Sequence, residues 1–397
     1  MRKRYLLLII ALMPLMAVAQ DITATLPVPA QKSGNLFHMA SDSAKGKPVL
    51  LQPFYWVKTL IDSSAVATVD RSYIEQPKKS WSVEARTSVS HSSLHMEADW
   101  SFEDLLDGRI STDTDNGYPM SLGVWAGYRG YGIGISKQLG GEGSTFSFGA
   151  MGGSFGINLR ISTYRCHTPY VAYSFASVGE VSAGGEKVPL DDPVRVRSLF
   201  LDGYYMFNGK HFSYAAAYDQ SLIQRRSAGS LAAGVMYYHS SVAYDEDSCW
   251  PLILMMRGIG KMKFTQANVG VGYAYNWVPA RGWLVSAMCM PMLTFYNKTN
   301  VYYYDTQDHN GVSVYEAALF DSENFDYDGN YKVVEEDEYS TNNRVTWNFD
   351  ARMSLVYNWS NFYLRVYGHY NRFRYSSDEG EGRLSDWTAY ASLGFRF

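Results

Sequence analysis

The sequence predicts an all-β protein, a closed antiparallel transmembrane β-barrel of about twelve strands, within a range of 10–14. Three observations predict this fold: a secretory leader, a final alternating segment that ends on an aromatic residue, and repeats of that alternation along the chain. No apolar run approaches the ~20 residues that a transmembrane helix needs. The mean hydropathy of −0.22 would suit a soluble protein, but a barrel strand shows only every second residue to lipid.

The leader occupies residues 1–19. Arg2, Lys3 and Arg4 form a basic start, an apolar stretch follows, and the small residues before Gln20 suit cleavage near Ala19. Cleavage would leave 32 of the 35 basic residues against 39 acidic ones, a net charge of about −7. This balance excludes a nucleic-acid partner, which would call for a basic stripe. The expected location is the outer membrane of a Gram-negative bacterium.

The mature chain divides into two parts. Residues 20–79 lack clear periodicity and are expected to form a periplasmic extension or a partial plug. Residues 80–397 are expected to form the barrel. Three cysteines are an odd number, so they do not indicate a disulfide framework.

The last segment carries the clearest signal. Apolar residues alternate strictly with polar or small ones from Trp387 to Phe397, so one face of a strand is apolar and the other is not. Phe395 and Phe397 close the chain and resemble the signal by which outer-membrane barrels are recognised for insertion. The barrel-assembly machinery is therefore an expected partner during insertion.

Segments with strand-like patterns precede the last one. Several are long enough to cross a membrane, whereas strands of a soluble sandwich are nearer ~5–6 residues. The expected strands are 81–91, 119–128, 131–138, 144–163, 195–207, 211–220, 229–241, 267–277, 283–296, 345–359, 362–371 and 387–397. Gly152-Gly153 could split the fourth in two, and Asn208-Gly209 is a strong hairpin signal.

Turns and loops sort onto two sides of this barrel. With the C-terminus in the periplasm, the short turns near 129, 279 and 360 also face the periplasm. The long polar loops then face outside, as is usual for such barrels: 92–118, 242–262, 298–343 and 376–385. The region 208–228 is the exception, because its Asn-Gly turn falls outside.

Several short motifs stand in the middle of the chain and just before the first strand: Leu201-Asp202-Gly203-Tyr204-Tyr205, Phe207-Asn208-Gly209, the run Phe212 to Ser230, Tyr73-Ile74, Pro77 and Trp81. In these motifs the chain resembles a family of predicted bacterial outer-membrane proteins known as domain of unknown function 4421. The resemblance covers roughly residues 63–397 and implies a barrel, but no reaction, ligand or catalytic residue. Ala215 departs from the family's pattern, where proline is expected.

Charged residues of both signs recur on the predicted inward faces of the strands. In a narrow barrel they pair and fill the interior; the alternative is that they line a selective pore. If the last strand closes against the first, Arg396 and Glu84 lie near each other. The lumen-facing candidates are Glu84, Arg86, Asp350, Arg352, Arg365, His369 and Arg396.

Two further motifs give weaker predictions of a binding site. Arg225 and Arg226 could bind an anion, although pairing with lumen acids or lipid phosphates at a strand end is favoured. The acidic loop 298–343 has oxygen ligands at alternate positions, as in a calcium loop. Tyr331 replaces the required glycine there, so a solvated loop is favoured over a metal site at Asp326, Asp328, Asn330 and Asp337.

An enzyme is the minority hypothesis. His239 and Ser241 share a strand face, as a membrane lipid hydrolase with a serine nucleophile would need, but His91 and Ser93 match this spacing equally. The leading hypothesis is a non-enzymatic porin-like or envelope-structural protein, and a component of a secretion or surface assembly is a third. No cofactor is expected, outer-membrane lipid is an expected partner, and the oligomeric state stays open.

Overall fold

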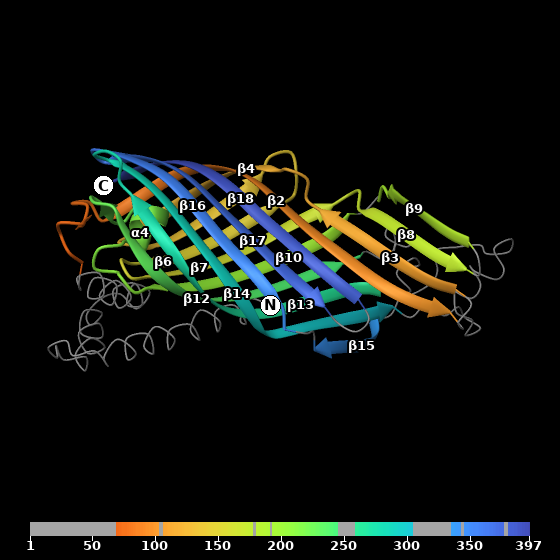
Figure 1. Cartoon of the computed structure of the whole chain (residues 1–397). Coiled ribbons are helices and arrows are strands. Elements are labelled where there is room, and N and C mark those ends of the chain that lie inside the picture. Colours follow the sequence, from red (N-terminus) through yellow and green to blue (C-terminus); the bar gives the residue numbers. More distant parts are fainter. Residues whose placement is uncertain are drawn as a thin grey trace, which may run out of the picture. The chain divides into compact units, whose positions relative to one another are not determined.

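The computed structural model describes residues 69–102, 106–177, 180–190, 193–244, 259–304, 335–342, 345–376 and 380–397. Twelve long strands form a closed barrel (Figure 1). They are β2 (Trp81–Phe102), β4 (Met120–Tyr128), β5 (Tyr131–Gln138), β6 (Ser144–Met151), β7 (Phe155–Cys166), β10 (Val194–Met206), β12 (Ala228–Ala243), β13 (Ile259–Trp277), β14 (Trp283–Tyr304), β16 (Trp347–Trp359), β17 (Phe362–Ser376) and β18 (Gly380–Arg396). The predicted fold class is confirmed.

The barrel closes between its first and last strands. Each strand pairs antiparallel with the next one in this series, and β18 pairs with β2 in an unbroken register from Gly380↔Ala98 to Arg396↔Ser82. The chain end joins the same seam, because the amide nitrogens of Trp81 and Phe397 each donate to the other's carbonyl. Closure leaves no strand edge unpaired in the ring itself.

Four further strands, outside the closed ring, extend the sheet at the end of the barrel opposite the C-terminus. The second half of β2, from Ser93 to Phe102, pairs with β3 (Leu106–Asp115). β3 pairs in turn with β8 (Tyr170–Ser177), and β8 pairs with β9 (Glu180–Lys187). Separately, β15 (Glu335–Asn342) pairs with β14. At the C-terminal end, β1 (Ile74–Glu75) pairs with β11 (Ile223–Gln224), beside the one-turn helix α4 (Tyr214–Tyr218). Within the described residues, no helix has the length and apolarity to cross a membrane.

The two faces of the wall follow the alternation in the sequence. Along β12, Ala232 and Met236 are buried in the lumen, whereas Leu231 and Val235 are more than half exposed on the outside. The same alternation places buried polar residues inside the barrel and apolar residues outside it on most other strands. This arrangement is the reverse of a soluble protein and is typical of a barrel in lipid.

The predicted number of strands is right, but two predicted segments are wrong in compensating ways. Residues 144–163 form two strands, because the chain turns back at Gly152-Gly153, where the Gly152 amide donates to the Phe155 carbonyl. Residues 211–220 form no strand. The side chain of Ser213 caps α4 by accepting from the Ala216 amide, and all five helical residues are buried.

These two corrections remove the inconsistency in the predicted topology. The connection from β10 to β12 now lies at the same end as the turns near 129, 279 and 360. Asn208-Gly209 is not a hairpin turn, since neither residue has the positive φ that a type I′ turn needs. Arg129 and Gly130, with φ of 48° and 92°, supply that turn between β4 and β5.

The closing seam predicts a specific cross-link. In a cysteine-free background (C166S, C249S, C289S), Ala85→Cys with Leu393→Cys should form a disulfide on oxidation, since these residues face each other across β2 and β18. A shift in electrophoretic mobility would report the bond. Ala85→Cys with Ala389→Cys, four residues along the strand, should not cross-link; equal cross-linking of both pairs would contradict the register.

Candidate functional site

The seven lumen-facing candidates all lie on the inner side of the wall, on β2, β16, β17 and β18. Six of them are buried, and the side chain of Arg86 is 16% exposed. The structure gathers six of them, with residues that the sequence did not single out, into three ion-pair clusters. Arg396 belongs to none of these clusters and donates to the Gln220 carbonyl. No direct contact joins Glu84 and Arg396, although they lie on neighbouring strands near the same end.

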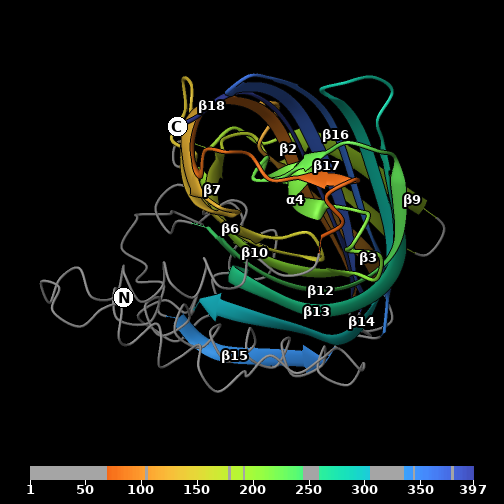
Figure 2. The same cartoon turned by 90° about the vertical axis from the view of Figure 1, so that its left-hand side faces the viewer.

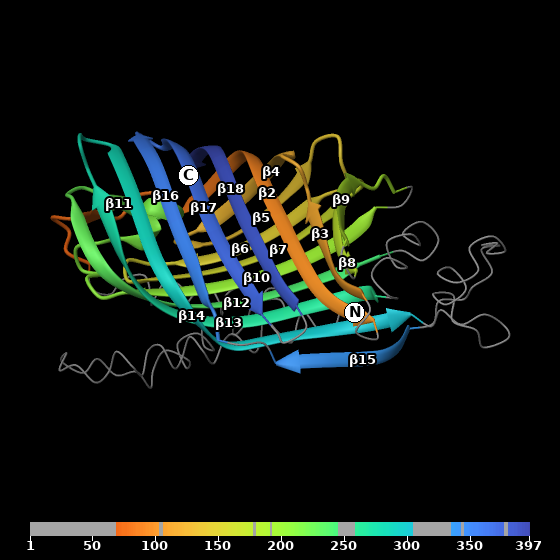
Figure 3. The ribbon, with the colours of Figure 1, turned by 45° about the vertical axis from the view of Figure 1, so that its right-hand side comes forward.

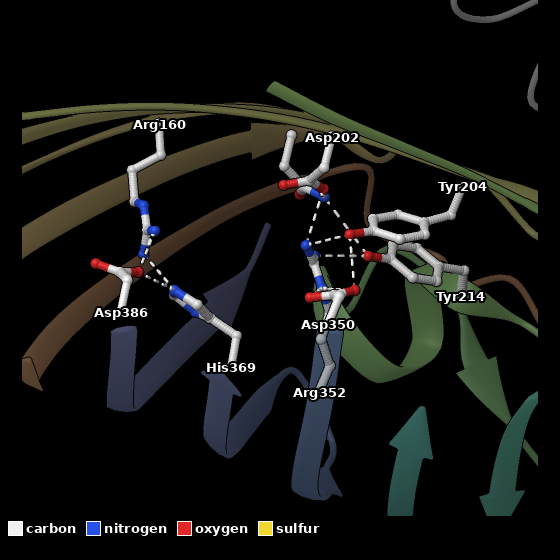
Figure 4. Close-up of polar contacts among 9 residues, drawn as sticks. Arg160, Asp202, Tyr204, Tyr214, Asp350, Arg352, His369 and Asp386 are labelled. Carbon is white, nitrogen blue, oxygen red and sulfur yellow. Dashed lines mark hydrogen bonds and ion pairs between the residues drawn. The ribbon is translucent and has the colours of Figure 1, made fainter. Parts of the chain in front are cut away.

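The first cluster surrounds Arg352 (Figure 4). Its guanidinium pairs with Asp202 at 3.0 Å and with Asp350 at 3.5 Å. It also donates to the hydroxyls of Tyr204 at 2.6 Å and Tyr214 at 2.9 Å, and Tyr204 donates in turn to Asp350. Two strands, β10 and β16, and the helix α4 are therefore tied to one buried cation, and each nitrogen of its guanidinium is used.

The second cluster surrounds the buried carboxylate of Glu84. Arg365 and Arg86 both contact Oε2 of Glu84, at 2.8 Å and 2.6 Å, and Tyr363 donates to its Oε1 at 2.8 Å. The guanidinium carbon of Arg86 lies 4.1 Å from the ring centroid of Trp125, a cation–π contact. Two cations on one carboxylate leave a surplus of positive charge toward the lumen.

The third cluster joins Arg160, Asp386 and His369 (Figure 4). Arg160 pairs with Asp386 at 2.5 Å and donates to Nε2 of His369, which lies 3.5 Å from the same carboxylate. Because Nε2 of His369 accepts this hydrogen bond from Arg160, the imidazole is neutral and carries its proton on Nδ1. That Nδ1 is buried and has no hydrogen-bond partner within the described residues.

Sequence reasoning missed Arg160, Asp202 and Asp386. The first lay in a segment whose division into strands was undecided, and the last stands one residue before the predicted final strand. The second lies on a correctly predicted strand, where the same parity argument would have found it. For Arg160 and Asp386, the sequence did not show where the strand begins or ends. For Asp202, the strand was predicted correctly, and the alternation along it was not applied to every residue.

Residues 207–227, here called the plug, fill the end of the lumen that holds the C-terminus (Figure 2). Arg365 donates to the Tyr218 carbonyl, and Arg396 donates twice to the Gln220 carbonyl, at 3.0 and 3.1 Å. On the opposite wall, Asn276 donates to the Ser213 carbonyl at 3.0 Å. The plug is thus bonded to both sides of the barrel.

The start of the described chain covers the plug. Ile74, fully buried, pairs with Gln224, whose side-chain oxygen accepts from the Ser213 amide at 2.9 Å. Asp219 is buried in the plug, and this burial raises the pKa of Asp219 above its ordinary value, against an opposing hydrogen bond from Ser221. A neutral carboxyl is the less costly form in such surroundings.

Part of the lumen is not filled. A cavity of about 110 Å³ lies where β4–β6 present small residues such as Ser136 and Ser147 to the interior. A few waters or a small solute fit such a volume. Four arginines are among the residues that line it: Arg86, Arg160, Arg352 and Arg365.

The basic cluster predicted at Arg225 and Arg226 faces the N-terminal segment and not the lumen. Arg225 pairs with Glu75 at 2.7 Å, and Arg226 lies over the ring of Tyr73. These contacts join β11 to β1 at the mouth of the barrel. Their exposed positions make the pairing weak in energy.

The other candidates are placed as follows. The Phe395 ring packs against the Phe362 ring across β17 and β18 at a tilt of 43°, and Phe397 is exposed at the chain end. Asp326, Asp328 and Asn330 lie outside the described residues, as does the side chain of Asp337. Among the side chains that the structure describes, no group of three or more His, Cys, Asp or Glu could hold a metal ion.

His239 and Ser241 both face the outside of β12. The described contact of His239 joins its Nδ1 to the Thr265 hydroxyl on β13, at 2.9 Å, and not to Ser241. Among the residues that the structure describes, no third group that would orient the imidazole toward the serine is paired with His239. The geometry of a nucleophile and its base is therefore not assembled here.

Comparison with known proteins gives a family but no relative of known activity. The family described as Domain of unknown function (DUF4421) matches residues 68–397. No curated protein matches.

Solved structures with similarity to this chain include the outer membrane protease OmpT from Escherichia coli (8% identity, TM-score 0.39, 80% of this chain and 97% of that one). Another is the translocator domain of the autotransporter NalP from Neisseria meningitidis (8% identity, TM-score 0.28, 92% and 100%). A third is the outer membrane protein OprG from Pseudomonas aeruginosa (10% identity, TM-score 0.25, 81% and 99%).

The Arg352 cluster predicts a large loss of stability on removal of its cation. Arg352→Met leaves Asp202 and Asp350 buried without a counter-ion, which should lower the free energy of unfolding by about 3–5 kcal/mol. Denaturant titration of the folded barrel in detergent measures this. The triple variant R352M/D202N/D350N should recover most of the loss; a triple variant as unstable as R352M would contradict the assignment.

Proposed function

We propose that this chain, which belongs to the family described as Domain of unknown function (DUF4421), is a non-enzymatic envelope-structural protein: an outer-membrane barrel with a closed lumen. The family supplies no activity, so the proposal stands on the outer surface and the interior of the barrel. The single observation that carries it is the plug, bonded to opposite walls at one mouth of the lumen.

The outer surface supports a membrane location. Leucine, isoleucine, valine and methionine side chains that would be buried in a soluble protein are about half exposed or more: Leu122, Val124, Ile135, Val235, Val271, Met353 and Leu393. They lie on strands all around the ring. A continuous apolar surface of this extent needs a nonaqueous neighbour, since soluble monomers rarely expose large apolar patches.

Aromatic residues border this surface at two levels. Phe362 and Phe395 pack against each other at the C-terminal end, and Tyr370 lies opposite Trp387 farther along β17 and β18. Eight residues separate Trp387 from Phe395, which is about 20 Å along the membrane normal at the usual ~40° tilt. That distance is close to the ~25 Å apolar band of outer-membrane barrels, whose borders carry such aromatic girdles.

The interior supports closure. The plug occupies the C-terminal mouth, and two of the clusters connect facing walls: Arg352 joins β16 to β10, and Arg160 joins β7 to β18. Arg365 joins β17 to β2, the two strands that flank β18 in one wall. Each cation is held by at least one carboxylate inside the barrel. An open porin keeps a water-filled channel instead, so a passive pore is the weaker hypothesis.

One observation favours a second candidate, a gated path for anions. The cavity beside β4–β6 is bordered by four arginines, and among its charged lining residues only Asp202 is acidic. Movement of the plug could connect this space to the periplasm. The two candidates differ in whether a conducting state ever forms.

Replacing the plug with a short linker distinguishes the closed barrel from a gated path for anions. Asn208 donates to the Gly229 carbonyl at 2.8 Å, so the two ends of the plug are adjacent and a short Gly-Ser linker can replace residues 209–227. In planar bilayers the native chain should show no sustained conductance, while the plug-replaced barrel should conduct. Sustained conductance by the native chain would contradict the closed-lumen proposal.

Lipid hydrolysis is the alternative that needs direct exclusion. The outward position of Ser241 and the bond from His239 to Thr265 predict no serine chemistry. We expect release of fatty acid from phospholipid vesicles at the background rate for both the native chain and Ser241→Ala. Release by the native chain that Ser241→Ala abolishes would establish the enzyme instead.

A further inference from the structure

The outer wall formed by β17 and β18 is ordered in tiers. These strands lie side by side with β16 and β2 in one wall (Figure 3). Toward the end away from the C-terminus, apolar residues such as Leu364 and Leu393 give way to the cross-strand pair of Tyr370 and Trp387. Arginines come next on the same outer face.

Three arginines gather in this tier: Arg372, Arg374 and Arg383, here called the arginine trio. Arg374 and Arg383 are directly opposite in the register of β17 and β18, and Arg372 is two residues along the same face. Directly opposite residues have Cβ atoms ~4.5–5.5 Å apart, and like charges placed so destabilise a sheet. The arrangement therefore costs stability unless something neutralises it.

No carboxylate within the described residues neutralises the trio. None of its members forms an ion pair there, and Nε of Arg372 is buried without a hydrogen-bond partner. Two described acids on the adjoining strands β2 and β3 have other partners. Asp113 contacts His95 at 2.8 Å, and Glu97 contacts Arg109 at 2.8 Å.

The same order of tiers recurs on β10–β14. Tyr237 and Tyr296 face outward, and beyond them on the same face lie basic residues without an ion pair among the described residues: Arg197, Lys263 and Lys298. Lys263 lies over the ring of Tyr302 at 4.2 Å. Two separate walls thus carry a basic tier just beyond their aromatic residues.

We propose that the arginine trio is a binding site for the phosphate groups of a phosphorylated lipid headgroup in the outer leaflet. The inference rests on the proposed outer-membrane location, which puts this tier at the headgroup level. A guanidinium fork binds phosphate oxygens through two parallel hydrogen bonds. The lipid supplies negative charge that the described side chains do not place beside the trio.

The test compares lipid binding by the native chain and by R372Q/R374Q/R383Q, both purified in neutral detergent. The probe is lipid A with two phosphates, counted as bound adducts by native mass spectrometry, beside the dephosphorylated lipid. The native chain should bind the phosphorylated lipid about tenfold more tightly than the variant, since each charge-assisted hydrogen bond contributes at least ~1.4 kcal/mol. The dephosphorylated lipid should bind both proteins equally weakly.

A matched control removes three cations at the other end of the barrel: R71Q/K78Q/K79Q, all at exposed positions. It should bind the phosphorylated lipid like the native chain. Equal binding by the trio variant and the native chain would overturn the proposal, and so would loss of binding in the control alone. Displacement by an equimolar amount of inorganic phosphate would also overturn it, because the site would then recognise a free anion.

Two further measurements keep the result interpretable. If the triple variant does not fold, R383Q alone replaces it in the test. This variant breaks the directly opposed pair of arginines and should weaken binding of the phosphorylated lipid severalfold. Insertion of the native chain into lipid vesicles tests the membrane location separately. A chain that inserts but shows no preference for phosphorylated lipid overturns this inference only, whereas a chain that fails to insert overturns the proposed function.

Discussion

A β-sheet in hydrocarbon cannot keep an unpaired edge, because no water is present to satisfy its amides and carbonyls. The pairing of β2 with β18 meets this constraint, and the other features of the protein follow from it. Closure fixes which face of every strand is inside. It thereby commits Glu84, Arg365 and their neighbours to the lumen and leaves the leucines and valines of the same strands to the outside.

Once the ring is closed, the interior has to neutralise its own charges. Burying a single guanidinium without a partner would cost several kcal/mol, which is why each buried arginine contacts a carboxylate or a carbonyl on another element. These pairs do more than balance charge. Arg365 and Arg396 bind carbonyls of the plug, so the same residues that neutralise the lumen also hold it shut.

The plug explains a feature that the strand pattern misrepresents. Residues 211–220 have the spacing of a short strand, but they begin at a serine cap and form a one-turn helix inside the barrel. Tyr214 then reaches Arg352 on the far wall at 2.9 Å. Gly156 makes room for this ring, because a Cβ there would lie 2.1 Å from it.

The predicted number of strands is right only because the errors at residues 144–163 and 211–220 cancel. The sequence by itself determined the barrel, the inward face of each lumen-facing candidate and the side on which most loops lie. Alternation with a period of two and the final Phe397 suffice for these, because they are local consequences of strand geometry. Only the tertiary structure decided that residues 211–220 fold into the lumen and that Arg160 pairs with Asp386. It also placed Arg374 opposite Arg383. Such partners lie on strands brought together by register and closure, and no local pattern records which distant residue will stand across the lumen or across the next strand.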